Sequence, residues 1–319
     1  MCASTPTISP MSPATYRKVC VAALVAVCMI VVTGAAVRLS GSGLGCADWP
    51  NCNAQKLIDV STAHGAIEQI NRLFTGVVMV VVVAAVLGAI KRRPRRADLT
   101  RLAFVIALGV PMQGLVGAIV VLSDLNPFAN QQHFLLSMAL VALSVVLVVR
   151  AGDPDHAKRV PIVTGRTSVR VRLITALTGL ALVTGTFVTG AGPHAGDERA
   201  KRFDVAIGAV ARIHGITVMC TIGVAIALLW RLRTQHADRH VLENPLTTWL
   251  VIAVAQAGIG YTQYFSGVPA VLVGIHVAFA TALWLATVQL QLSTAAVIRA
   301  EPPVWSSVSP AATAPAPSA

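Results

Sequence analysis

Eight long apolar stretches, separated by short polar segments, dominate the sequence. Each is close to the span of about 20 residues that a helix needs to cross a bilayer. Only helices and closed barrels satisfy their backbone polar groups in lipid, and unbroken runs of this length are helical. The pattern predicts an all-α polytopic membrane protein with eight transmembrane helices, at roughly 19–37, 64–90, 101–122, 131–150, 173–191, 209–230, 246–264 and 270–292.

Polar and small residues recur at matching places in the two halves of the chain. Gln113–Gly117 reads Gln-Gly-Leu-Val-Gly, and Gln256–Gly260 reads Gln-Ala-Gly-Ile-Gly, 143 residues later. His133 and His276, which each begin a further apolar stretch, are separated by the same 143 residues. A shared offset for two features indicates a duplicated chain with a four-helix bundle in each half.

The ends of the chain are rich in Pro, Ser, Thr and Ala. Such segments cannot bury enough apolar surface to fold, so we expect both to be disordered. The expected segments are a disordered cytoplasmic N terminus at 1–18, an N-terminal four-helix half at 19–150, a cytoplasmic linker at 151–172, a C-terminal four-helix half at 173–292, and a disordered cytoplasmic tail at 293–319.

Composition excludes an ordinary soluble domain, because 55% of the 319 residues are hydrophobic, only 12% are charged and the mean hydropathy is +0.72. The net charge of +12 is distributed by loop, since 18 of the 25 Lys and Arg residues fall on the side of the two termini. By the positive-inside rule, both termini are expected in the cytoplasm, in a multi-pass protein of the bacterial cell membrane. The charge therefore reflects topology, and the expected surroundings are the lipid bilayer and no nucleic acid.

A histidine stands at the mouth of each even-numbered apolar stretch. His64 and His214, each followed by glycine, lie 150 residues apart and complete a set with His133 and His276. These stretches all run from outside to inside, so we expect the four imidazoles at one depth near the outer face. Two imidazoles from parallel helices suit the axial positions of a planar metal macrocycle, which predicts a bis-histidine heme site in each half. Zinc is disfavoured, because tetrahedral sites usually add cysteines or carboxylates close by.

Charged residues follow His64 along one helical face. Glu68 and Arg72 lie at i+4 and i+8 from it, and ionisable groups at the end of a membrane-length segment indicate a site. Glu68 has no counterpart 150 residues later, where Val218 stands. The alternative is that Glu68 only pairs with Arg72. Arg72 and Arg212 lie near histidines and are expected to pair with heme propionates, the alternative being that they extend to the membrane interface.

Cys46 and Cys52 lie six positions apart in the first outer loop. On an oxidising face of the membrane this arrangement indicates a disulfide, with two free thiols as the alternative.

In combination, these features resemble the heme A synthase family over about residues 19–292. The resemblance rests on the duplicated eight-helix pattern, the four histidines, the cysteine pair, the Gly-Pro-His-Ala-Gly-Asp segment at 192–197 and Glu-x-x-Asn-Arg at 68–72. It implies an oxidoreductase that converts the C8 methyl group of heme O to a formyl group, giving heme A for terminal oxidases. Heme O synthase and terminal oxidase assembly factors are the expected protein partners.

The resemblance also implies roles for single residues. In the C-terminal half it implies a heme B cofactor whose iron is held by His214 and His276, with Arg212 nearby. In the N-terminal half it implies a substrate heme, with His64 and His133 at the iron, Arg72 at the rim and Glu68 as the catalytic carboxylate, expected to accept a proton or orient water.

Two positions depart from the family pattern. Many members have Glu-x-x-His-Arg where this chain has Glu-x-x-Asn-Arg, so Asn71 occupies the histidine position and His64 is the candidate replacement. Some members carry a cysteine pair in each outer loop, whereas this chain has only Cys46 and Cys52.

Two other classes of function fit composition and spacing. One is a bis-histidine membrane cytochrome b that relays electrons without porphyrin chemistry, and the other is a transporter, since duplicated bundles are common among transporters. Glu68 favours the enzyme, because it makes the duplication asymmetric where chemistry needs a carboxylate.

Overall fold

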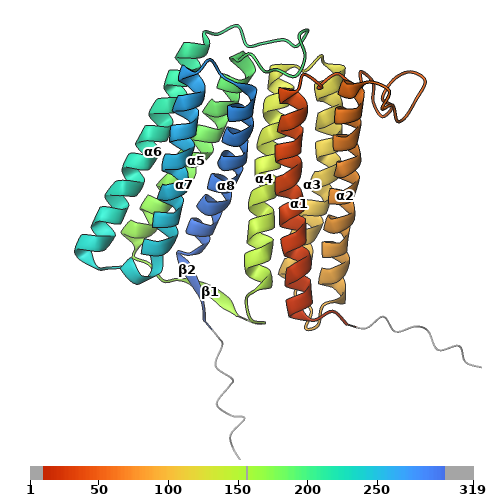
Figure 1. Ribbon diagram of the computed structural model, residues 1–319. Coiled ribbons are helices and arrows are strands. Elements are labelled where there is room, and N and C mark those ends of the chain that lie inside the picture. Colours follow the sequence, from red (N-terminus) through yellow and green to blue (C-terminus); the bar gives the residue numbers. More distant parts are fainter. Residues whose placement is uncertain (1–9, 156, 299–319) are drawn as a thin grey trace, which may run out of the picture.

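The computed structural model describes residues 10–155 and 157–298, and within these ranges the chain forms eight long α-helices and two short β-strands (Figure 1). Residues 1–9, 156 and 299–319 lie outside the description. The elements are α1 (Pro13–Leu39), α2 (Ala63–Lys91), α3 (Ala97–Leu122), α4 (Pro127–Ala151), β1 (Lys158–Pro161), α5 (Gly165–Ala191), α6 (Ile207–Gln235), α7 (Arg239–Phe265), α8 (Ala270–Leu292) and β2 (Ala295–Ile298).

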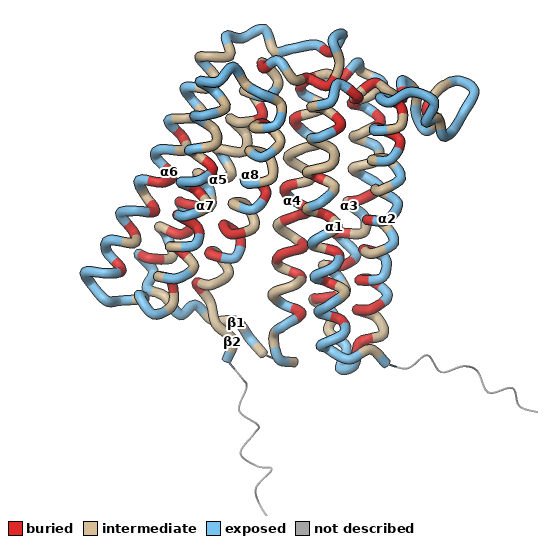
Figure 2. Tube along the Cα trace, viewed as in Figure 1, coloured by how far each residue is buried: buried red, intermediate tan, exposed pale blue. Residues whose placement is uncertain are grey.

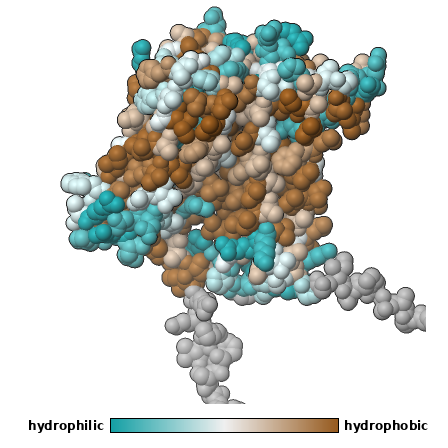
Figure 3. All heavy atoms as spheres, viewed as in Figure 1, coloured by the Kyte–Doolittle hydropathy of each residue, from teal (hydrophilic) through white to brown (hydrophobic). Residues whose placement is uncertain are grey.

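Seven of the helices in the described ranges are long and apolar enough to cross a membrane. The eighth, α7, is as long as α1 at 27 residues and packs against α6 and α8 in the same bundle (Figure 1). Hydrophobic side chains cover the middle of the visible face, and hydrophilic ones gather toward its two ends (Figure 3). An apolar surface of this extent is typical of contact with lipid. The predicted all-α polytopic membrane protein is confirmed.

The helices pack as two groups of four, α1–α4 and α5–α8 (Figure 1). Buried residues lie on the inward faces of the helices (Figure 2), and they gather into one hydrophobic core per group, with Val141 fully buried in the first and Trp249 almost fully buried in the second. Between the groups α4 lies beside α8, where the indole Nε1 of Trp284 donates to the carbonyl oxygen of Met138 at 2.9 Å.

Outer loops join the two groups at the end of the bundle opposite the termini. The amide of Gly43 donates to the carbonyl oxygen of Gly196 at 2.9 Å, and Arg38 Nη1 donates to the carbonyl oxygen of His194 at 2.6 Å. Gly196 has φ +107°, a backbone conformation that favours glycine because it has no Cβ. A backbone hydrogen bond therefore joins the loops 40–62 and 192–206, and the side chain of Arg38 joins the end of α1 to the second loop.

The start of α1 differs from the expected disordered N terminus at 1–18. Helix α1 begins at Pro13, where Ser12 accepts a hydrogen bond from the amide of Thr15 and proline occupies the first turn. Tyr16 is completely buried in the first core. Residues 13–18 are therefore helical, because a cap and a buried aromatic ring extend the helix beyond the apolar stretch; the rest of that prediction falls largely on residues 1–9, outside the description.

The linker and the tail also differ from expectation. Helix α4 continues to Ala151, α5 already begins at Gly165, and between them β1 pairs antiparallel with β2 from the predicted tail. Arg159 in β1 forms a bidentate pair with Asp153 at 2.7 and 2.8 Å and reaches the carbonyl oxygen of Leu292. Residues 295–298 are ordered by this pairing, and the prediction for 299–319 lies outside the described residues.

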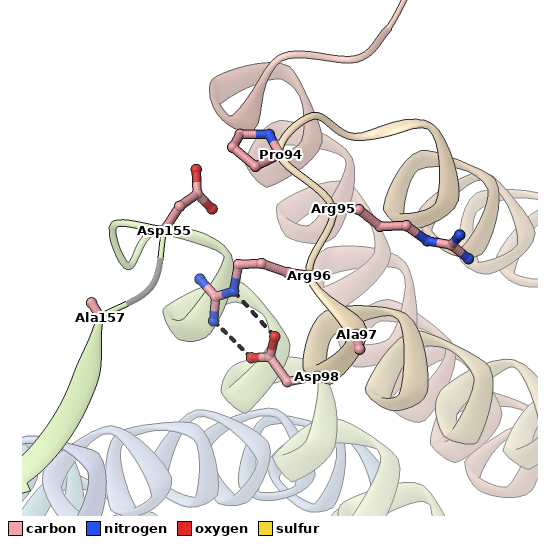
Figure 4. Close-up of a pocket in the computed structure, with 7 residues that line it drawn as sticks. All are labelled: Pro94, Arg95, Arg96, Ala97, Asp98, Asp155 and Ala157. Atoms are coloured by element: carbon pink, nitrogen blue, oxygen red, sulfur yellow. Dashed lines mark hydrogen bonds and ion pairs between the residues drawn. The ribbon is translucent and has the colours of Figure 1, made fainter.

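A cavity of about 350 Å³ opens at this same end of the molecule (Figure 4), lined by Pro94, Arg95, Arg96, Ala97, Asp98, Asp155 and Ala157. Arg96 forms two hydrogen bonds with Asp98, at 2.7 and 3.1 Å (Figure 4). Arg92, only 1% exposed, pairs with Asp155 at 2.7 Å. These charges neutralise one another, and the cavity lies at the far end of α2 and α4 from their histidines, so it is no part of the histidine site.

Candidate functional site

His214 and His276 face each other between α6 and α8. Their ring centroids lie 6.5 Å apart and the ring planes are inclined at 72°. Two metal–nitrogen bonds of about 2 Å each, together with the two half-rings, account for about this separation. The spacing therefore fits two imidazoles on opposite sides of one metal ion in a planar macrocycle.

The hydrogen bonds of the rings support the same arrangement. His214 Nδ1 lies 3.1 Å from Thr184 Oγ1, which leaves Nε2 for a metal. His133 Nδ1 and His276 Nδ1 are buried and have no partner within the described chain, and buried polar atoms ordinarily have one. The described residues contain no group of three or more His, Cys, Asp or Glu side chains arranged for a metal ion. The donor set thus suits a heme better than a tetrahedral metal.

A glycine on the preceding helix makes room for each of these rings. A Cβ added at Gly117 would lie 3.4 Å from His133 Cε1, one at Gly185 would lie 3.2 Å from His214 Cε1, and one at Gly260 would lie 2.9 Å from His276 Cε1. Side-chain carbons rarely approach as closely as 2.9 or 3.2 Å, so alanine at Gly260 or Gly185 would push the ring, whereas at Gly117 it would be in close contact with the ring. Of the repeated glycines in the sequence, Gly117 and Gly260 are therefore ring contacts.

Glutamines fix the backbone of two of the histidines. Gln113 Nε2 donates to the carbonyl oxygen of His133 at 3.0 Å, and Gln256 Nε2 donates to the carbonyl oxygen of His276 at 3.0 Å. The sequence predicted no role for these glutamines. The 143-residue offset that they share with His133 and His276 is the feature of the sequence that links each glutamine to its histidine.

His64 does not share the depth of the other three histidines, which corrects the prediction of one common level. It is the second residue of α2, whereas His214 is the eighth residue of α6, about two turns into its helix. The His64 side chain is exposed, and its Nδ1 lies 2.9 Å from Ser42 Oγ. The 150-residue offset aligns the His-Gly pair at 64–65 with the one at 214–215. The first pair lies at the start of its helix and the second inside its helix, so the two histidines are not structurally equivalent.

Glu68 and Arg72 hold the first outer loop. Glu68 is only 5% exposed, accepts from the amide of Cys46 at 2.8 Å and pairs with Arg72 Nη2 at 2.7 Å. Arg72 also donates to the carbonyl oxygens of Cys46, Asp48 and Asn51, at 3.1 to 3.2 Å. The pairing considered from the sequence is thus present, and most of the donors of Arg72 contact the loop.

The loop that they hold contains the two cysteines. The sulfur atoms of Cys46 and Cys52 lie within bonding distance, and both side chains are buried. A Cβ on Gly45 would overlap the backbone of His64, so the loop passes directly over the start of α2. Hydrogen bonds from Ser61 hold the pKa of the Asp59 carboxyl below its usual range and keep the end of the loop negatively charged.

Arg212 is exposed and has no hydrogen bond or ion pair to another described residue. By half of the chain, the site residues divide into two groups: His214, His276 and Arg212 in the second half, and His133, Glu68, Arg72 and the cysteine loop in the first. The contacts described above join His214 to His276, and Glu68 to Arg72 and the loop. His64 lies at the outer edge of the first group.

The sequence is similar to one family of known proteins. The COX15-CtaA family model, described as cytochrome oxidase assembly protein, matches residues 17–288. A heme A synthase of Listeria monocytogenes is 32% identical over 172 residues, which cover 52% of this chain and 56% of the relative. Heme A synthases of Shouchella clausii, 26% identical over 73% of this chain and 82% of the relative, and of Lysinibacillus sphaericus, 32% identical over 43% and 47%, are also similar. The chain spans just over half the length of the Listeria relative.

The glycine contacts generate a prediction. Gly260→Ala should push the ring of His276 and weaken heme binding by about tenfold, the usual size of an effect on a ligand's supporting contacts. The measurement is the heme-to-protein ratio of the purified protein from its absorption spectrum.

Gly258→Ala is the matched control, because a Cβ there meets no described atom within 4 Å. Equal heme content in the two variants would contradict the ring contact.

Proposed function

This chain belongs to the COX15-CtaA family of cytochrome oxidase assembly proteins, and on that premise we propose that it catalyses the oxidation of heme O to heme A. The C8 methyl group of the substrate becomes a formyl group, and the product serves terminal oxidases. The relatives that it resembles are heme A synthases, which supports this proposal. The observation that carries the proposal is the 6.5 Å spacing of the His214 and His276 rings across the second bundle.

In the second half, His214 and His276 are proposed to hold a heme B cofactor. When bound, this group supplies a one-electron carrier. Thr184 orients the His214 ring through Nδ1, and Gln256 fixes the backbone of His276, so both ligands are held before the cofactor arrives. The exposed guanidinium of Arg212 is proposed to pair with a propionate at the outer rim.

In the first half, heme O is proposed to dock between α2 and α4, with His133 at its iron. Gln113 and Gly117 position His133 as Gln256 and Gly260 position His276. Arg72 was expected to bind a propionate; its Nη1 and Nη2 donors hold the first outer loop, so any contact with the substrate adds to that role.

Glu68 is proposed to accept a proton or orient water during methyl oxidation. Its position supports this role, because the carboxylate is buried, has a fixed orientation and lies beside the cysteine loop. The ion pair with Arg72 fixes the direction in which the carboxylate points. The same contacts serve the fold, so a variant must separate the two roles.

The protein is proposed to lie in the bacterial cell membrane with both termini in the cytoplasm. The charge distribution supports this orientation. The start of α1 and the strand β2, the first and last described elements, lie at the same end of the bundle (Figure 1). Cys46 and Cys52 then face the oxidising side, which supports a disulfide between them. Heme O synthase and oxidase assembly factors are the proposed partners, in keeping with the family description.

Two measurements test the proposed function: the hemes present in the purified protein, and the conversion of heme O to heme A by its membranes. Protein expressed with a supply of heme O should contain heme B together with heme O or heme A, and its membranes should convert heme O to heme A. His214→Ala and His276→Ala should each abolish the low-spin heme B signal. Heme B alone, with added heme O left unchanged, would support the electron relay instead.

Glu68→Gln should lower heme A formation by about a hundredfold, the lower end of what a positioned proton acceptor contributes. Heme O should accumulate while the heme B content and the protein yield stay normal. Pigment extraction and chromatography measure both. Normal heme A production would leave Glu68 as a loop anchor only.

One labelling experiment tests both the membrane orientation and the disulfide between Cys46 and Cys52. A membrane-impermeant maleimide added to intact cells should label Cys46 and Cys52 only after treatment with an impermeant reductant. Labelling without reduction would contradict the disulfide. Labelling only after the cells are opened would contradict the orientation.

A further inference from the structure

The two halves of the chain can be aligned residue by residue at the histidine site. Gln113 and His133 correspond to Gln256 and His276, because each glutamine donates to its histidine's carbonyl oxygen at 3.0 Å and each pair is 143 residues from the other. The same offset applied to His214 leads to Asn71 and not to His64.

Hydrogen bonds to the neighbouring helix confirm this correspondence. Thr33 Oγ1 donates to Asn71 Oδ1 at 2.8 Å, and Thr184 Oγ1 lies 3.1 Å from His214 Nδ1. The two threonines are 151 residues apart, and the eight-residue difference from 143 is the difference in length between the outer loops 40–62 and 192–206. Asn71 therefore stands in the first half where His214 stands in the second.

The space beside Asn71 differs from the space beside His214. Gly185 follows Thr184, and a Cβ on it would lie 3.2 Å from the His214 ring. Gly34 follows Thr33, and a Cβ on it would meet no described atom within 4 Å. The room that an imidazole fills in the second half is thus left open beside the shorter Asn71.

His64 cannot fill that place from its position in the helix. It precedes Asn71 by seven residues, which is about 10 Å along the axis of α2. Its ring is exposed and bonded to Ser42 at the outer rim. His133, by contrast, has the same contacts as His276.

We propose that the first half binds its heme through His133 as the single axial histidine, with Asn71 beside an open axial position. This inference rests on the proposed function, in which that heme is the substrate. Asn71 Oδ1 is engaged by Thr33, so its Nδ2 remains as a hydrogen-bond donor. The two proposed hemes then differ in their protein ligands. The heme of the second half has two histidines, whereas the heme of the first half has one and can bind a small ligand from solution.

Carbon monoxide tests the open position, because it binds reduced heme that lacks a sixth ligand. Protein loaded with heme B and heme O is reduced and exposed to carbon monoxide. The difference spectrum should report binding at one heme of the two in the wild type, and His64→Ala should leave that signal unchanged.

Asn71→His should remove the carbon monoxide signal and add a second low-spin heme, since an imidazole fits the space beside Gly34. His133→Ala should lose the heme that binds carbon monoxide and keep the low-spin one. If Asn71→His does not accumulate, the His64→Ala result still decides the matter, because His64 is exposed.

Absence of carbon monoxide binding in the wild type and its gain in His64→Ala would make His64 the second ligand and overturn this inference, while leaving the proposed function intact. A wild-type protein that takes up no heme O would overturn both.

Discussion

Hydrogen bonds between neighbouring helices hold three of the histidines in this bundle, because lipid offers their partners no alternative. The histidine site depends on that constraint. A threonine on α5 orients one imidazole, glutamines on α3 and α7 fix the backbone of two others, and glycines one helix away set how closely the rings can approach. Each contact joins two neighbouring helices, so the packing of the bundle and the geometry of the site are set by the same interactions.

Much of the fold follows from hydropathy and duplication alone. The eight apolar stretches became helices because an unbroken apolar run of this length satisfies its own backbone polar groups in lipid as a helix. The extents of the elements could not be read in the same way: α1 starts early because Tyr16 is buried, and the linker becomes a strand because a distant segment pairs with it. Both depend on contacts that composition does not encode.

The candidate site was predictable where the two halves keep one offset and not where they diverge. His133, His214 and His276 occupy the expected places near the outer ends of their helices. His64 was misplaced because a His-Gly pair looks alike at the end of a helix and two turns inside it, and only the length difference of the outer loops separates the two cases. The contacts of Arg72 were likewise hidden, since they go to loop carbonyls and any sequence provides those.

The pairing of β1 with β2 has a consequence for the order in which the protein is made. Strand β2 follows α8, so the linker between the two bundles obtains its partner only after every helix has been synthesised. Until then Arg159 can hold Asp153 but not the carbonyl oxygens at the end of α8. The linker can therefore be joined to the end of the second bundle only after α8 has been made.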